Sequence, residues 1–363
     1  MTVAWIGDRD ALVQDAVGHA ARLLAESWCP VISIDADVDG TRAAIALAGR
    51  VGAAYDHFDG ESLARETALV SDSGGIFVSA GEVRRRADLV VVVGALPEFH
   101  HDYLRTLAET APDLAERRTR DFFLVPDRGN DPPPAALDGQ VTRLACDGAD
   151  LPATLAVVRA QVGGRPVTTP VTNFERLCDA LAKANYAAFL CSGHGTHHLA
   201  LEMLQGLVSD LNRKTRAAML MLPESEAGWG GTLVSGWTTG FPMRTGFAQG
   251  AAEHDPWRFD VRRMLGAGEA DVHLWVAARE DSAPAHANGS TLIALTKTAE
   301  PVAEAAVTIP VGAPGADHDA VLYSSSRSTF VGRTAGAPSQ LPSAASILKA
   351  IMEELPVKMD TRC

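Results

Sequence analysis

The sequence predicts an α/β protein made of two doubly wound units, each with a largely parallel sheet. Short apolar runs alternate with stretches whose apolar residues recur at helical spacing, which is the pattern of α/β folds. The run Leu89–Val93 is wholly apolar, as expected for a strand covered on both faces. A linker rich in Gly, Pro and Thr begins at Gly163 and separates two such alternations. With 363 residues, 47% of them hydrophobic, the chain has enough material for two cores.

In the first half, helices are predicted where apolar residues recur every three or four positions, and strands where short apolar runs lie between turn residues. The expected helices are Leu12–Leu24, Arg42–Val51, Tyr103–Ala115 and Leu151–Val162. The expected strands are Val31–Ile34, Leu89–Val93, Phe122–Val125 and Val141–Ala145. Asp39 and Thr41 favour a helix N-cap before Arg42, whereas residues 60–82 give only a weak, turn-rich signal.

The second half continues the alternation. The expected strands are Tyr186–Cys191, Ala217–Leu222, His273–Ala277, Thr291–Leu295 and Ala305–Ile309. The expected helices are Asn173–Ala184, one within residues 192–216, Val261–Leu265 and Ala344–Leu355. Alternating residues near Tyr323 and Thr329 indicate exposed strands.

The stretch Gly228–Asp260 fits neither period. It holds seven glycines and six large aromatic residues, so we expect irregular backbone there. Long loops in compact domains are uncommon and often functional, and this one is expected to line a cavity or a subunit contact; a loop that only caps a core is the alternative. Its aromatic side chains should be buried against the chain's own core or a partner, namely those of Trp229, Trp237, Phe241, Phe247 and Trp257.

Composition excludes several classes of protein. A net charge of −13 argues against a nucleic-acid partner, which needs clustered Lys and Arg. No run approaches the roughly 20 apolar residues of a membrane span, and no signal peptide is recognisable, so we expect a cytoplasmic protein without a membrane partner. Cysteines stand singly at 29, 146, 178, 191 and 363, which predicts buried free thiols and no zinc or iron–sulfur site.

The segment Ser192–His198 is the most suggestive local motif. Glycines between a strand and a helix N-terminus form an anion site, because unpaired amides and the helix dipole point outward. The candidate binding residues are Gly193, His194, Gly195, Thr196 and His197. No Lys follows the glycines, so this is not a P-loop, and neighbouring His197 and His198 point in different directions on a helix, which disfavours a metal site.

Two further groups carry possible chemistry. His100, His101 and Asp102 follow a predicted strand, where α/β proteins bind ligands, but nothing in the sequence converges on them and a solvated loop is the favoured explanation. The run Arg84–Arg86 suits an acidic ligand, yet such a run in an acidic protein usually pairs with local carboxylates. No nucleophile-elbow, zinc-protease or kinase signature is present, so the residues alone give no catalytic set.

Three segments resemble the B subunits of molybdenum or tungsten formylmethanofuran dehydrogenases: Gly81–Glu98, Ser209–Arg216 and Gly228–Phe247. The bacterial beta subunits of formyltransferase/hydrolase complexes are the most similar branch. The resemblance implies the molybdopterin oxidoreductase fold, with one Rossmann-like domain inserted into the other. It places a discontinuous domain at residues 1–59 and 166–330, an inserted domain at 60–165, and a C-terminal tail and helix at 331–363.

The chain also departs from the redox members of this resemblance. They begin with a four-cysteine cluster domain, whereas here Cys29 stands alone. They carry a metal-ligating cysteine ahead of the Gly81 motif, where this chain has Gly60, Glu61 and Ser62, and serine is a poor substitute for a thiolate on a soft metal. In those relatives the segment matching Gly193–His198 helps to hold pterin phosphates, so here it is expected to be a remnant pocket.

The resemblance therefore implies a structural subunit without catalytic residues, metal or cofactor of its own. Its complex would convert formyl-tetrahydromethanopterin to formate through a methanofuran-like carrier. The implied partners are an alpha subunit that is a metal-dependent amidohydrolase, a gamma subunit, and a delta formyltransferase. The alternatives are a pterin- and metal-dependent dehydrogenase subunit, or a module that binds the acidic arm of the carrier.

Overall fold

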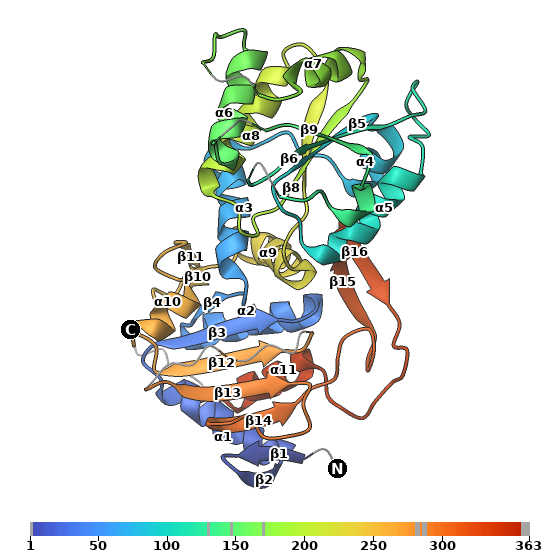
Figure 1. Cartoon of the computed structure of the whole chain (residues 1–363). Coiled ribbons are helices and arrows are strands. Elements are labelled where there is room, and N and C mark those ends of the chain that lie inside the picture. Colours follow the sequence, from blue (N-terminus) through green and yellow to red (C-terminus); the bar gives the residue numbers. More distant parts are fainter. Residues whose placement is uncertain are drawn as a thin grey trace. The chain divides into compact units, whose positions relative to one another are not determined.

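The computed structural model describes residues 3–128, 131–145, 148–168, 171–279, 284 and 289–356; Cys146 and Cys363 lie outside these ranges. The chain divides into two compact units (Figure 1). The first contains residues 1–60, 225–323 and 330–363, and the second contains 61–224 and 324–329. Each is a mixed α/β unit with parallel strands, so the predicted fold class is confirmed. The described cysteines Cys29, Cys178 and Cys191 are free thiols; Cys191 is buried, as predicted, whereas Cys29 and Cys178 are only partly buried.

The first unit is built on a nine-stranded sheet in the order β11-β10-β4-β3-β12-β13-β14-β1-β2. Its strands are β1 (Val3–Ile6), β2 (Arg9–Leu12), β3 (Pro30–Asp35), β4 (Ala54–Asp56), β10 (Thr245–Gly246), β11 (Glu253–His254), β12 (Val272–Ala277), β13 (Thr291–Thr296) and β14 (Ala305–Pro310). The strands from β4 to β14 in this order are parallel, whereas the β1–β2 and β10–β11 hairpins add antiparallel edges. A separate hairpin consists of β15 (Ala320–Ser324) and β16 (Thr329–Arg333).

Both faces of this sheet bury apolar side chains. The helices of the unit are α1 (Val13–Glu26), α2 (Val38–Val51), α9 (Glu226–Thr239), α10 (Val261–Gly266) and α11 (Ala344–Glu354). Ile32 and Ile34 of β3 belong to the main core together with residues of α1, α2, α9 and α11. Val31, one position away, packs with α10 on the opposite face, as the period of two in a strand requires.

The second unit has five parallel strands in the order β7-β6-β5-β8-β9. They are β5 (Leu89–Val93), β6 (Asp121–Val125), β7 (Val141–Arg143), β8 (Ala187–Cys191) and β9 (Ala217–Met221). The helices are α3 (Gly60–Ser73), α4 (Ala80–Arg86), α5 (His101–Glu109), α6 (Leu151–Val162), α7 (Phe174–Lys183) and α8 (His198–Leu211), with 3₁₀ turns at Glu98–His100 and Ala135–Leu137.

The apolar run of β5 behaves as its composition predicts. Val91 lies in a core with residues of α6, α7 and α8, whereas Val90 and Val92 lie in a second core with residues of α4 and α5. Alternate side chains thus enter opposite layers, and the strand is apolar throughout because both layers are covered.

The unit boundary differs from the predicted division at residue 166. Residues 166–224 belong with the second unit, because β8 pairs with β5 along Leu89–Val92 and β9 pairs with β8. The Gly163 linker joins two helices of this same unit rather than separating two domains. No clear sequence pattern marks the β1–β2 hairpin or α3, and the arginine run Arg84–Arg86 forms the end of α4.

The expectation of irregular backbone across Gly228–Asp260 was wrong for its first part, because residues 226–239 form the helix α9. Glycines occupy buried positions of this helix that usually carry apolar side chains, so the sequence lacks the helical period of 3.6 residues. Gly230 shows why they are needed: a Cβ atom there would lie 2.9 Å from Cβ of Tyr323. Of the five aromatic residues expected to be buried, Phe247 packs against the main core, whereas Trp237, Phe241 and Trp257 are exposed in this chain.

Close packing at Gly230 predicts a specific cost for added volume. We expect Gly230→Ala to lower the free energy of unfolding by about 1–3 kcal/mol relative to Gly236→Ala, because overpacking forces its neighbours to shift. Gly236 lies in the same helix with nothing within 4 Å of the added atom, so the gain in helix propensity is the same for both variants. Urea denaturation of the two variants measures the difference, and equal stability would contradict this packing.

Candidate functional site

The carboxyl edge of the second sheet is where this type of fold predicts a ligand-binding site. The chain adds β6 and β7 to the sheet on one side of β5, and then adds β8 and β9 on the other side of β5. Doubly wound sheets bind ligands at the carboxyl ends of the strands where the order reverses, which here is between β5 and β8. The loops at this position carry Gly94 and the predicted segment Gly193–His197, so the motif lies where a Rossmann-like site belongs.

The amide that opens the glycine turn is already bonded. The N–H of Gly193 donates to Oε1 of Glu66, from α3, at 2.7 Å in a buried setting. A Cβ atom at Gly193 would lie 2.6 Å from the carbonyl oxygen of Ser62 and 2.7 Å from Cγ of Glu66, so only glycine fits. The Glu66 carboxyl group therefore accepts the hydrogen bond of the Gly193 amide that an anionic ligand would otherwise accept.

Burial controls the protonation of Glu66. The side chain is fully buried, and this desolvation raises the pKa of Glu66 to about 8; the Gly193 N–H lowers it and Glu224 raises it further. Oε2 of Glu66 has no hydrogen-bond partner among the described residues. The neighbouring Cys191 thiol is also buried, and its pKa is raised by burial and by Glu66. Both groups are predominantly protonated at neutral pH.

The histidines of the motif do not converge. His194 is exposed and shares a hydrogen bond of 2.6 Å between its Nδ1 and Oε1 of Glu224. His197 caps α8, with its Nδ1 accepting from the N–H of Leu199 at 3.2 Å, and its ring stacks on that of His198. Within the described ranges, no group of three or more His, Cys, Asp or Glu side chains is arranged to hold a metal ion.

Thr196 and Gly195 complete the predicted set without adding a reactive group. Thr196 is buried, and its hydroxyl donates to the carbonyl oxygen of His194 at 3.2 Å. Gly195 has φ +62°, which suits glycine, and nothing lies within 4 Å of its Cβ position. The five residues thus form one turn, which Glu66 fixes through its hydrogen bond with Gly193, and the rings of His194 and His197 are exposed to solvent.

The other sequence candidates are dispersed. His100 is buried, and its Nε2 lies 2.8 Å from the carbonyl oxygen of Pro223, whereas Asp102 forms an exposed ion pair with Arg105. His101 lines a pocket of about 300 Å³ that Gly94 and Asp127 also line. Two of the three arginines pair with local carboxylates, as predicted: Arg85 with Asp113 and Arg86 with Glu82.

Sequence reasoning missed a buried polar group at the carboxyl edge of the first sheet. Asp35 ends β3, Asp56 ends β4, and His57 follows directly. Nδ1 of His57 accepts from the N–H of Asp59 at 2.9 Å, and its Nε2 lies 4.0 Å from Oδ1 of Asp35. Burial, with a contribution from Arg279, lowers the pKa of His57 to about 3, so the ring is neutral and this contact is not an ion pair. An Asp-His pair directly after a short apolar run was the available signal.

The chain is thus an α/β protein with two parallel-sheet units and, in its described part, a glycine turn closed by the protein's own carboxyl group. None of the described helices has the length and apolar character needed to cross a bilayer. No protein-family model matches the chain.

Known proteins nevertheless resemble it over nearly its whole length. The B subunit of the formyltransferase/hydrolase complex Fhc of Methylorubrum extorquens is 32% identical over 360 residues, which cover 97% of this chain and 98% of the relative. A chain in the crystal structure of the FhcABCD complex from the same organism, solved with methylofuran, superposes with a TM-score of 0.88 at 31% identity, covering 96% of this chain and 98% of that one.

A more distant relative is the B subunit of the tungsten-containing formylmethanofuran dehydrogenase 2 of Methanocaldococcus jannaschii. It is 24% identical over 278 residues, or 73% of this chain and 64% of the relative. The chain belongs to the family of the B subunits of formyltransferase/hydrolase complexes, as the resemblance in its motifs implied.

The raised pKa of Glu66 predicts a pH dependence of stability. Its ordinary value is about 4.3, so between roughly pH 4 and 8 the folded state holds a proton that the unfolded state has lost. This group therefore makes stability fall as pH rises through that window, by at most about 1.4 kcal/mol per pH unit. Glu66→Gln keeps an acceptor for Gly193 and should remove this slope.

Urea denaturation at several pH values measures the effect as the difference between wild type and Glu66→Gln. Asp56, whose pKa is raised to about 7 by burial, contributes in the same direction in both proteins and cancels in the difference. The control is Glu61→Gln, an exposed position on the same helix, which should run parallel to wild type. A Glu66→Gln curve that is also parallel to wild type would show that Glu66 is ionised in the folded protein.

Proposed function

We propose that this chain is a non-catalytic structural subunit of a formyltransferase/hydrolase complex of the Fhc type. Such a complex passes the formyl group of formyl-tetrahydromethanopterin through a methanofuran-like carrier and releases it as formate. The observation that carries the proposal is similarity over 97% of the chain to the B subunit of this complex. The partners are the amidohydrolase, the gamma subunit and the formyltransferase, with the carrier bound within the assembly.

The candidate site supports a role without chemistry in this chain. A general base must lie within reach of a substrate proton and have a suitable pKa. His194 bonds Glu224 and His197 caps α8, so their rings do not converge on one point, whereas His57 is buried and neutral. We propose that catalysis in the complex belongs to the partner subunits, including a metal-dependent hydrolase.

A pterin and a soft metal do not fit the residues present. The Gly193 amide, which matches the phosphate-holding segment of the redox relatives, is bonded to Glu66. Ser62 stands where those relatives carry a thiolate, and its own carbonyl crowds Gly193. Molybdenum and tungsten sites use soft ligands, so we propose that this chain holds no such cofactor in its cytoplasmic setting.

Elemental analysis checks this part of the proposal. We expect molybdenum, tungsten and iron at background level in the chain purified from its own host, because the thiolate ligands are missing and Glu66 occupies the turn. Plasma mass spectrometry on the separated subunit is the measurement. About one molybdenum or tungsten atom per chain would favour the dehydrogenase alternative instead.

Histidine variants test the absence of catalysis. His194→Ala and His197→Ala should leave turnover per assembled complex within about twofold of wild type, whereas loss of a general acid or base typically costs about 10²–10⁴-fold. Formate release from formyl-tetrahydromethanopterin, normalised to assembled complex, is the quantity to measure. A hundredfold drop in either variant with intact assembly would place chemistry in this chain.

A variant expected to impair assembly, but not catalysis, provides the comparison for the histidine variants. Trp237 and Phe241 contact the rings of Phe330 and His254 in this chain but stay exposed, which leaves apolar surface for a partner to bury. Trp237→Ala combined with Phe241→Ala should lower activity in proportion to the loss of assembled complex, leaving turnover per complex unchanged.

A further inference from the structure

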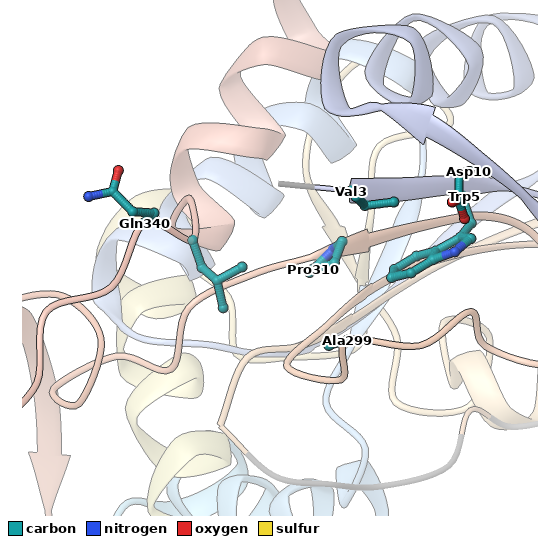
Figure 2. A pocket seen from close by; sticks show the side chains of 7 residues that line it. Val3, Trp5, Asp10, Ala299, Pro310 and Gln340 are labelled. Carbon is teal, nitrogen blue, oxygen red and sulfur yellow. The ribbon is translucent and has the colours of Figure 1, made fainter. Parts of the chain in front are cut away.

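A pocket at the outer edge of the first unit is separate from both carboxyl-edge groups described above. Its volume is about 540 Å³, within the range of small-molecule sites. Val3 and Trp5 of β1 and Asp10 of β2 form one side, Pro310 at the end of β14 lies between, and Ala299 follows β13 (Figure 2). The pocket thus adjoins the carboxyl ends of two neighbouring parallel strands.

Strand register brings an aromatic ring and a carboxylate together in this pocket. Trp5 and Asp10 are directly opposite each other in the β1–β2 ladder, so their side chains project from the same face of the hairpin. Figure 2 shows them side by side at one end of the pocket, with Gln340 at the other end. Because the two strands form a hairpin, the pairing is fixed by local structure.

The charge of the pocket is one-sided. Among the described residues that line it, Asp10 is the one that carries a charge. Within the described part of the chain, the Asp10 carboxylate forms no hydrogen bond or ion pair. The protein as a whole carries −13, so the surrounding field adds to the local preference for a cation.

The aromatic wall adds a second preference for the same ligand. Trp5 is half-buried, which leaves part of its indole accessible, and Val3 and Pro310 extend the apolar lining. A cation over an indole is attracted by the electron-rich face of the ring, in addition to its attraction to a carboxylate. We propose that this pocket binds a small organic cation, an ammonium group carried on an apolar stem.

Other small ligands fit less well. An anion would face the Asp10 carboxylate and the negative field of the chain. A neutral apolar molecule would gain nothing from the exposed Asp10 carboxylate, because it supplies neither a positive charge nor a hydrogen-bond donor. The ammonium places its charge at Asp10 and its stem along Val3 and Pro310, so each part of the ligand meets matching chemistry.

Benzylammonium chloride and its neutral analogue benzyl alcohol are suitable probes for the full-length chain. A saturation-transfer NMR titration should give saturable binding of the ammonium at least fivefold tighter than that of the alcohol. The preference should shrink as sodium chloride is raised from 50 to 500 mM, because the Asp10 contribution is electrostatic. Equal affinity for both probes, or no saturable binding, would overturn the proposal.

Two carboxylate variants test whether the preference for the ammonium probe arises at this pocket. Asp10→Asn should remove the preference for the ammonium, whereas Asp8→Asn, in the adjacent turn and outside the pocket, should keep it. A loss of preference in Asp8→Asn equal to that in Asp10→Asn would show that general charge, not this pocket, attracts the probe. The experiment needs no partner subunit, so its result is independent of the proposed role in a complex.

Discussion

Buried Arg244 connects the glycine- and aromatic-rich stretch Gly228–Asp260 to the sheet of the first unit. The guanidinium of Arg244 donates from Nε to Oδ2 of Asp56 at 3.2 Å, pairs through Nη2 with Oδ2 of Asp260 at 2.9 Å, and donates from Nη1 to the carbonyl oxygen of Pro256 at 2.6 Å. It thereby ties the end of β4 to the segment after α9 and to the N-terminus of α10. Burial raises the pKa of Asp56 to about 7 even beside this cation, so its carboxylate depends on Arg244. A buried charge that loses its partner costs about 3–5 kcal/mol, which makes this contact a strong constraint on the first unit.

The second unit uses a buried acid differently. Glu66 meets a backbone amide in place of a cation, and its raised pKa leaves it mostly as the neutral acid at pH 7. A neutral acid satisfies one amide of the Gly193 turn without placing a full charge in the core. The turn keeps the geometry of a Rossmann-like edge while its first amide is used internally. This arrangement accounts for a family member that retains the fold of cofactor-binding relatives and serves, as we propose, as a structural part of a complex.

Much of the fold follows from sequence pattern, because each core strand is an apolar run covered on both faces. Leu89–Val93 and Leu151–Val162 match their predicted bounds, and most other elements match within a few residues. The helix α9 was missed because Gly230 and Gly231 replace the side chains that would mark its buried face. The placement of β8 beside β5 was missed because local pattern carries no information on which strands pair. At the candidate site, the Gly193 turn was found from its glycines, but Glu66 lies 127 positions away and reads as an ordinary helix residue. Family resemblance supplied the expected function, which residue chemistry alone did not.

The central claim is that this chain is a structural subunit of a hetero-oligomeric complex. Native mass spectrometry of material purified through a tag on this chain, from its own host, tests that claim most directly. The account predicts an assembly that contains this chain together with the hydrolase, gamma and formyltransferase subunits. A monomer or a homo-oligomer without these companions, with formyl transfer and hydrolysis intact in the remaining fraction, would contradict it.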